Sequence, residues 1–160
     1  MPARKTAMLE LLVALFFAGA VSPASAHTPA GCPVTKPNGT TYQGHRVENS
    51  HGNGALWTGL WSDGTVVFRP GGPGFVHRDG SLSMKFGWYR GVRGKLTIQG
   101  RRLDGPAPPL RARIPEGYGD IGFQSTALIF PTEGCWEVTG KVGEASLTFV
   151  TRVVKLEVSD

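Results

Sequence analysis

The sequence predicts an all-β protein in which two sheets pack as a sandwich. Three observations support this fold class. Many short runs rich in β-branched and aromatic residues are separated by glycine, proline, asparagine and aspartate. No stretch beyond residue 26 has the periodicity of an amphipathic helix. Two cysteines follow an N-terminal export signal, which is typical of a small exported domain closed by a disulfide.

The first 26 residues have the three parts of a secretory signal peptide. Arg4 and Lys5 supply the positive start, residues 7–21 are mainly apolar, and Ala24-Ser25-Ala26 is a small-residue cleavage motif. Glu10 interrupts the apolar run, which is also shorter than the ~20 residues of a membrane-spanning helix. We therefore expect residues 1–26 to be removed and the protein not to span a membrane. The expected location is secreted, either extracellular or periplasmic.

The exported chain divides into a lead-in and one sandwich domain. Residues 27–54 are rich in glycine, proline, asparagine and threonine, which predicts an irregular segment, and residues 55–160 form the predicted sandwich. Ser62-Asp63-Gly64 favours a tight hairpin turn, and the prolines at 106, 108 and 109 indicate an edge or a crossover between sheets. The expected strands are 55–61, 65–68, 81–89, 95–103, 110–114, 123–130, 135–141 and 146–158.

Cys32 and Cys135 are the only cysteines, and we expect them to form a disulfide. Such a bond would tie the lead-in to a strand near the C-terminus and stabilise the fold by about 2–4 kcal/mol. The alternative is a lipoprotein, since Ala30-Gly31-Cys32 resembles the end of a lipidation signal. Pro29 stands where that signal usually has a leucine-like residue, and a single lipid anchor would leave Cys135 unpaired.

The stretch ALIFPTEGCWEVTG, residues 127–140, resembles the strand, corner and strand of immunoglobulin-like domains. Together with HGNGALW at residues 51–57, it is similar to a group of uncharacterised secreted bacterial proteins. The resemblance implies an immunoglobulin-like β-sandwich whose final hairpin includes residues 142–158, and it implies no activity. In a standard immunoglobulin domain the paired cysteines lie within ~70 residues of each other and join the two sheets across the centre of the sandwich, so the wider spacing of Cys32 and Cys135 departs from the family.

Trp57 and Trp61 are a candidate ligand platform. They are four residues apart in a predicted strand, which would place them on one face with Gly59 between them, and exposed tryptophan faces stack on sugar rings. The alternative is that both indoles pack in the interior, as we expect for Trp136. The partner is unknown; a carbohydrate or a cell-envelope protein are the candidate classes.

His27 is the sharpest chemical hypothesis in the sequence. If cleavage follows Ala26, the α-amine and imidazole of His27 could chelate one copper ion, which resembles the mature N-terminus of copper-dependent polysaccharide monooxygenases and periplasmic copper carriers. A further ligand could come from His45, His51 or His77. The flanking motifs of those families are absent, and an exposed histidine without a function is the alternative.

No catalytic constellation is evident. The glycine-rich segment at residues 69–74 lacks the Gly-Lys-Ser/Thr ending of a phosphate loop, and no Gly-x-Ser-x-Gly elbow surrounds any serine. The net charge of +5 is mild and spread along the chain, which argues against a nucleic-acid partner. The sequence therefore predicts a secreted, non-catalytic binding or structural module without a cofactor. The alternative is a copper-binding protein or copper-dependent oxidoreductase that uses His27.

Overall fold

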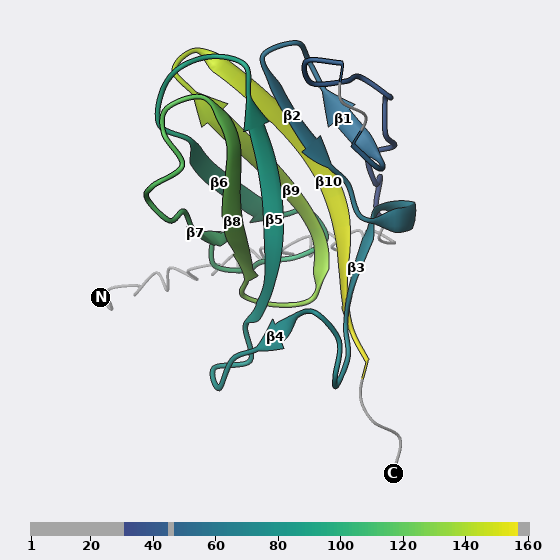
Figure 1. The fold of residues 1–160 in the computed structure, drawn as a ribbon. Coiled ribbons are helices and arrows are strands. Elements are labelled where there is room, and N and C mark those ends of the chain that lie inside the picture. Colours follow the sequence, from purple (N-terminus) through teal and green to yellow (C-terminus); the bar gives the residue numbers. More distant parts are fainter. Residues whose placement is uncertain (1–30, 45–46, 157–160) are drawn as a thin grey trace, which may run out of the picture.

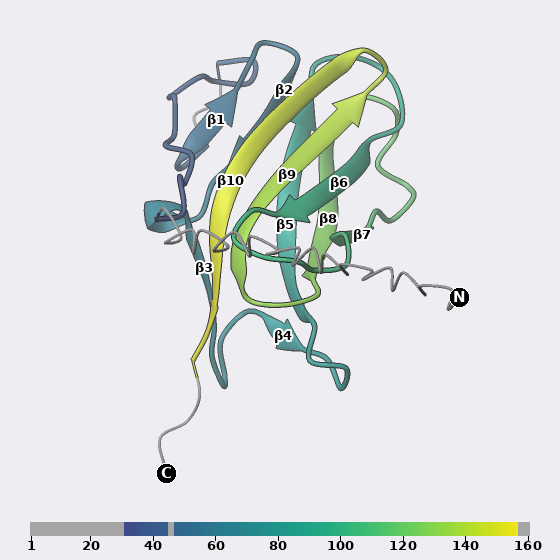
Figure 2. The same cartoon turned by 180° about the vertical axis from the view of Figure 1, so that it is seen from behind.

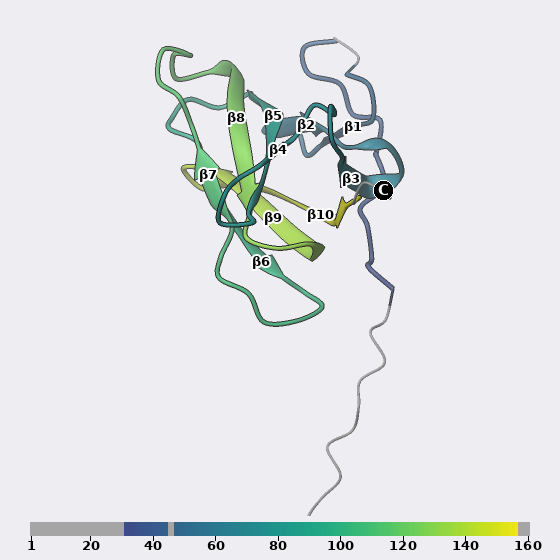
Figure 3. The same ribbon diagram turned by 90° about the horizontal axis from the view of Figure 1, so that it is seen from below.

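The computed structural model describes residues 31–44 and 47–156, which form two β-sheets packed face to face (Figure 1). Figure 3 shows the two layers from below, with β1, β2, β5 and β8 in one layer and β3, β10 and β9 in the other. The described residues contain no α-helix. The prediction of an all-β sandwich is confirmed. No helix within the described ranges is both long and apolar enough to cross a membrane.

The larger sheet has the strand order β1-β2-β5-β8-β7, with β4 paired to β5, and the smaller sheet has the order β3-β10-β9-β6 (Figure 2). Each predicted strand has a counterpart among the described residues, although residues 157 and 158 of the last one lie outside them, and β1 and β4 are additional. Their bounds are β1 (Ser50–Gly52), β2 (Leu56–Gly59), β3 (Thr65–Phe68), β4 (Phe75–Val76), β5 (Leu82–Arg90), β6 (Thr97–Arg102), β7 (Arg111–Arg113), β8 (Gly122–Phe130), β9 (Gly134–Val142) and β10 (Ala145–Lys155).

Alternation along β5 and β8 builds much of the core. In β5 the buried positions are every second residue from Leu82 to Arg90, and β8 alternates in step because the two strands pair in antiparallel register over nine residues. The centre of the core is aromatic: Trp88 and Trp136 are fully buried, as expected for Trp136. Gly140 of β9 faces Trp88 so closely that a Cβ atom there would lie 2.5 Å from the indole ring.

The turn at residues 62–64 forms as expected, but it does not join a hairpin. A short 3₁₀ turn, η1 (Ser62–Gly64), carries the chain from β2 in the larger sheet to β3 in the smaller one. Asp63 and Gly64 adopt positive φ angles of 54° and 65°. β3 then pairs in parallel with β10 rather than with β2. The hairpin prediction was wrong because a tight turn fixes the local direction of the chain and not the sheet that it enters.

The prolines at 106, 108 and 109 lie between β6 and β7, which belong to different sheets, so the predicted crossover is confirmed. The lead-in is irregular over most of its described length but ends in β1, which pairs with β2. The amide side chain of Asn38 bonds both backbone groups of Gly52, donating to its oxygen and accepting from its nitrogen. Asn38 thus satisfies the outer edge of β1 as a further strand would.

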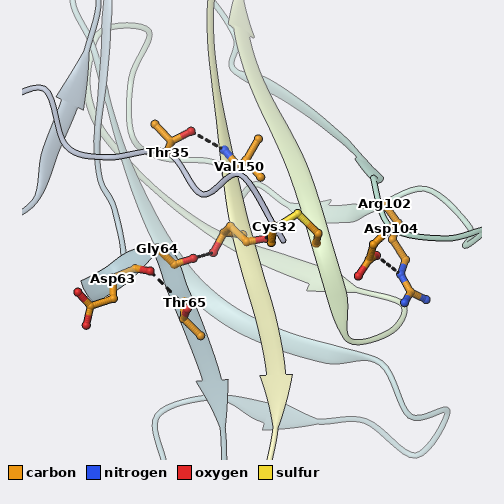
Figure 4. Close-up of a disulfide and its surroundings, with 10 residues drawn as sticks. Cys32, Thr35, Asp63, Gly64, Thr65, Arg102, Asp104 and Val150 are labelled. Carbon is orange, nitrogen blue, oxygen red and sulfur yellow. Dashed lines mark hydrogen bonds and ion pairs between the residues drawn. A yellow bond between two sulfur atoms is a disulfide. The ribbon is translucent and has the colours of Figure 1, made fainter. Parts of the chain in front are cut away.

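The disulfide between Cys32 and Cys135 is present, with 5.4 Å between the Cα atoms (Figure 4). It joins the lead-in to β9. Thr35 continues the attachment on β10, because its backbone N–H donates to the Val150 oxygen and its hydroxyl accepts from the Val150 N–H. The structure therefore supports the predicted pairing rather than a lipidated Cys32.

We predict that replacing both cysteines by alanine lowers the free energy of unfolding by about 2–4 kcal/mol, because the bond closes a loop with a sequence separation of 103 residues. Urea unfolding of the oxidised protein and the Cys32→Ala/Cys135→Ala variant measures the difference. An unchanged midpoint would contradict the stabilising role of the bond.

We also predict that Gly140→Ala destabilises the protein by about 1–3 kcal/mol, because the added methyl group overlaps the fixed ring of Trp88. Thermal unfolding of Gly140→Ala and of Lys141→Ala, an exposed neighbour in the same strand, provides the comparison. Equal melting temperatures for the two variants would contradict the tight packing of Gly140 against Trp88, because they would show that the two sheets can move apart there at no cost in stability.

A candidate binding face on the larger sheet

Trp57 and Trp61 do not form the shared platform that their spacing predicted. The alternation of side chains between the two faces of the sheet ends at Gly59, the last residue of β2. The next residue, Leu60, is buried, and its backbone N–H donates to the Asn49 oxygen. Trp61 therefore packs on the core rings of Phe86, Phe130 and Phe149. Trp57, only 8% exposed, lies on the outer side of the larger sheet.

Trp57 instead begins a row of aromatic side chains across the larger sheet. It pairs in register with Tyr89 of β5, which pairs with Phe123 of β8. Tyr42 of the lead-in lies 5.1 Å from the Trp57 ring and 5.2 Å from the Tyr89 ring, and Phe123 lies 5.2 Å from Tyr89 and 5.9 Å from Tyr118. We call these five residues the aromatic row.

The row is buried at one end and exposed at the other. Phe123 and Tyr118 are 45% and 38% exposed and lie next to each other, and adjacent exposed rings mark interaction sites more often than single ones do. Beside them the outward positions are small: Gly87 of β5 pairs with Ser125 of β8. A Cβ atom on Gly87 would approach the Phe123 ring to 2.9 Å, so the glycine allows the ring to lie down over the sheet. The result is a shallow surface with an aromatic border.

Arg90 holds the exposed end of the row in place. It ends β5, is 1% exposed, and forms no ion pair with any described carboxylate. Its guanidinium donates to the backbone oxygens of Gly94, Tyr118, Gly119 and Gly122 at 3.0–3.4 Å. Carbonyl dipoles thus replace water around a buried cation, and they tie the loop that carries Tyr118 to the sheet.

Two further contacts fix the same loop, residues 114–121. Buried Gln124 donates to the Pro115 oxygen at 3.0 Å, and Arg93 forms an exposed ion pair with Asp120 at 3.0 Å. The loop itself, together with Arg90 and Gln124, lines an open pocket of about 430 Å³. These contacts therefore hold the loop, and with it Tyr118, in place before any ligand binds.

The opposite end of the face is basic. Ala127 of β8 pairs with Lys85 of β5 on one side and with Arg113 of β7 on the other, so the three residues lie on one line across the strands. Arg111 is two residues before Arg113 in β7 and pairs with Ile129. Arg111 contacts Asp79 at 3.3 Å. Hydrogen bonds from the hydroxyl and N–H of Ser81, aided by Arg111, hold the pKa of Asp79 below its ordinary value.

A second charged cavity, of about 470 Å³, adjoins the disulfide. Arg102 and Asp104 form an ion pair there at 2.7 Å (Figure 4). Partial burial raises the pKa of Asp104, but the bonds from Arg102 and from backbone N–H groups outweigh it and leave this pKa below its ordinary value. Because these charges neutralise each other beside the attachment of the lead-in, we assign the cavity a structural role.

The copper hypothesis stays a prediction. His27 and His45 lie outside the residues that the structure describes. His51 contacts the Thr148 oxygen at 3.4 Å, and His77 packs against Phe75. Within residues 31–44 and 47–156, no three histidine, cysteine, aspartate or glutamate side chains gather as metal ligands would.

No protein-family model, curated protein or solved structure matches this chain.

We predict that Arg90→Ala loosens the loop and lowers the free energy of unfolding by about 3 kcal/mol, since buried carbonyl groups lose their donors. Hydrogen exchange should accelerate in residues 115–122. Arg90→Lys keeps the charge but has fewer donors, and we expect an intermediate effect. Unchanged exchange in Arg90→Ala would contradict the proposed role in positioning.

Proposed function

We propose that the protein is an exported, non-catalytic binding module that holds a carbohydrate chain against the exposed end of the aromatic row. The observation that carries this proposal is the placement of Phe123 and Tyr118 beside the small outward residues Gly87 and Ser125. A flat surface bordered by exposed rings suits the C–H faces of sugar rings, which pack on aromatic side chains.

The fixed arrangement of the rings supports binding rather than incidental exposure. Tyr89 and Phe123 are neighbours in adjacent strands, and the Arg90 bonds to Tyr118 and Gly119 anchor the loop. A ligand that meets rings already in position loses less conformational entropy on binding than one that must order them. The two exposed rings are also neighbours, and contiguous exposed apolar surface marks an interaction site more often than a single exposed side chain does.

The proposed location follows from the export signal and the disulfide. Residues 1–26 have the pattern of a cleaved signal peptide, and the Cys32–Cys135 bond is of a kind that persists in oxidising compartments. We place the protein outside the cytoplasm, where polysaccharides of the cell exterior are the accessible ligands. We also propose that the sandwich is of the immunoglobulin-like type, supported by the final hairpin of β9 and β10.

The test removes the two exposed rings together. We predict that Tyr118→Ala/Phe123→Ala stays folded, because both side chains are well exposed, and loses at least tenfold in affinity for the polysaccharide that the native protein selects from a glycan array. The matched control is Val67→Ala/Leu103→Ala, which removes two similarly exposed apolar side chains that lie outside the aromatic row, in β3 and just after β6.

Circular dichroism and urea unfolding establish that each variant is folded. Equal binding by the ring-deleted variant and the native protein would contradict the proposal. So would a native protein that binds no glycan on the array.

A further inference from the structure

We infer that the carbohydrate is acidic, and that its anionic groups bind Lys85 and Arg113 while its rings lie against the aromatic row. The inference rests on the proposed function, and it adds the chemical class of the ligand. Its basis is the cations at the other end of the same face, which have no part in the proposed contacts between sugar rings and the aromatic row.

The charge on this face is one-sided. The outward positions of β5, β8 and β7 include three cations and no carboxylate: Ser83, Lys85, Gly87, Tyr89, Phe123, Ser125, Ala127, Ile129, Arg111 and Arg113. Arg111 is partly neutralised by Asp79. Lys85 and Arg113 are exposed and form no ion pair with any described residue. Two uncompensated cations therefore face solvent beside the shallow surface.

The spacing fits one extended ligand. Lys85 and Tyr89 are four residues apart in β5, which is about 13 Å at the usual rise of a strand. Lys85 and Arg113 lie two strands apart on one cross-strand line, about 10 Å at the usual strand separation. A short oligosaccharide can cover this distance, with Gly87, Ser125 and Ala127 leaving room for its rings.

The arrangement favours a polysaccharide over a nucleic acid. A protein that binds single-stranded nucleic acid usually combines a continuous basic groove along the backbone with rings on which successive bases stack. Here the unpaired cations are confined to one end, and the aromatic row lies at the other with small residues between. An acidic polysaccharide carries its carboxylate groups at the edges of its rings and presents apolar C–H faces between them, which suits both the cations and the aromatic row.

The experiment compares two forms of one polymer. We would measure the binding of polygalacturonate and of its fully methyl-esterified form by calorimetry, with alginate as a second acidic polymer and oligo-dT as the nucleic-acid probe. The variant is Lys85→Gln/Arg113→Gln. The matched control, Lys141→Gln/Arg152→Gln, removes the same charge from exposed positions of β9 and β10 in the other sheet.

We expect an acidic polymer to bind at least tenfold more tightly than the methyl-esterified polymer at low salt, and we expect this preference to fall as salt rises. Lys85→Gln/Arg113→Gln should abolish the preference, and the control should keep it. Equal binding of acidic and esterified polymers, or equal losses in both double variants, would overturn the inference. Tighter binding of oligo-dT than of either acidic polymer would also overturn it.

The outcomes separate the two proposals. If the esterified polymer binds as well as the acidic one and Tyr118→Ala/Phe123→Ala abolishes both, the proposed function stands and the acidic ligand is wrong. If that ring-deleted variant binds every polymer as the native protein does, the proposed function itself fails.

Discussion

The register between β5 and β8 is the constraint on which the structure depends. Nine consecutive antiparallel pairs fix which side chains enter the core and which face outward. A shift of one residue would move Trp88 to the surface and bring Tyr89 into the core. The same pairing sets Tyr89 beside Phe123 and sends Arg90 inward to bind the loop that bears Tyr118. The packing of the interior and the candidate binding face are therefore two results of one pairing.

The sequence was sufficient for the fold class because the signals involved are local. Alternation and turn residues predicted the long strands, and the two cysteines of a chain predicted to be exported indicated the bond between Cys32 and Cys135. β1 and β4 were missed because they are only three and two residues long and depend on neighbouring strands for their backbone bonds. The parallel pairing of β3 with β10 was also out of reach, since it joins segments distant in the chain.

The candidate site was harder to predict because it depends on where a strand ends and on which residues of neighbouring strands pair. Trp57 and Trp61 were expected to share a face, but this holds only while a strand continues, and β2 ends at Gly59. Tyr89 and Phe123 lie at the ends of strands that the sequence did predict, yet only their register makes them neighbours. The signal that could have found them is the outward alternation of β5 and β8, which gives Lys85 and Tyr89 the same face.

The binding face on the larger sheet is tested most directly by locating the bound ligand on the protein by NMR. Amide chemical shifts of ¹⁵N-labelled protein would be followed while polygalacturonate fragments are added. We expect the largest changes in residues 85–89, 113–121 and 123–127, on the outer face of the larger sheet and its loop. Changes concentrated in β9 and β10, or in the cavity beside the disulfide, would contradict this placement.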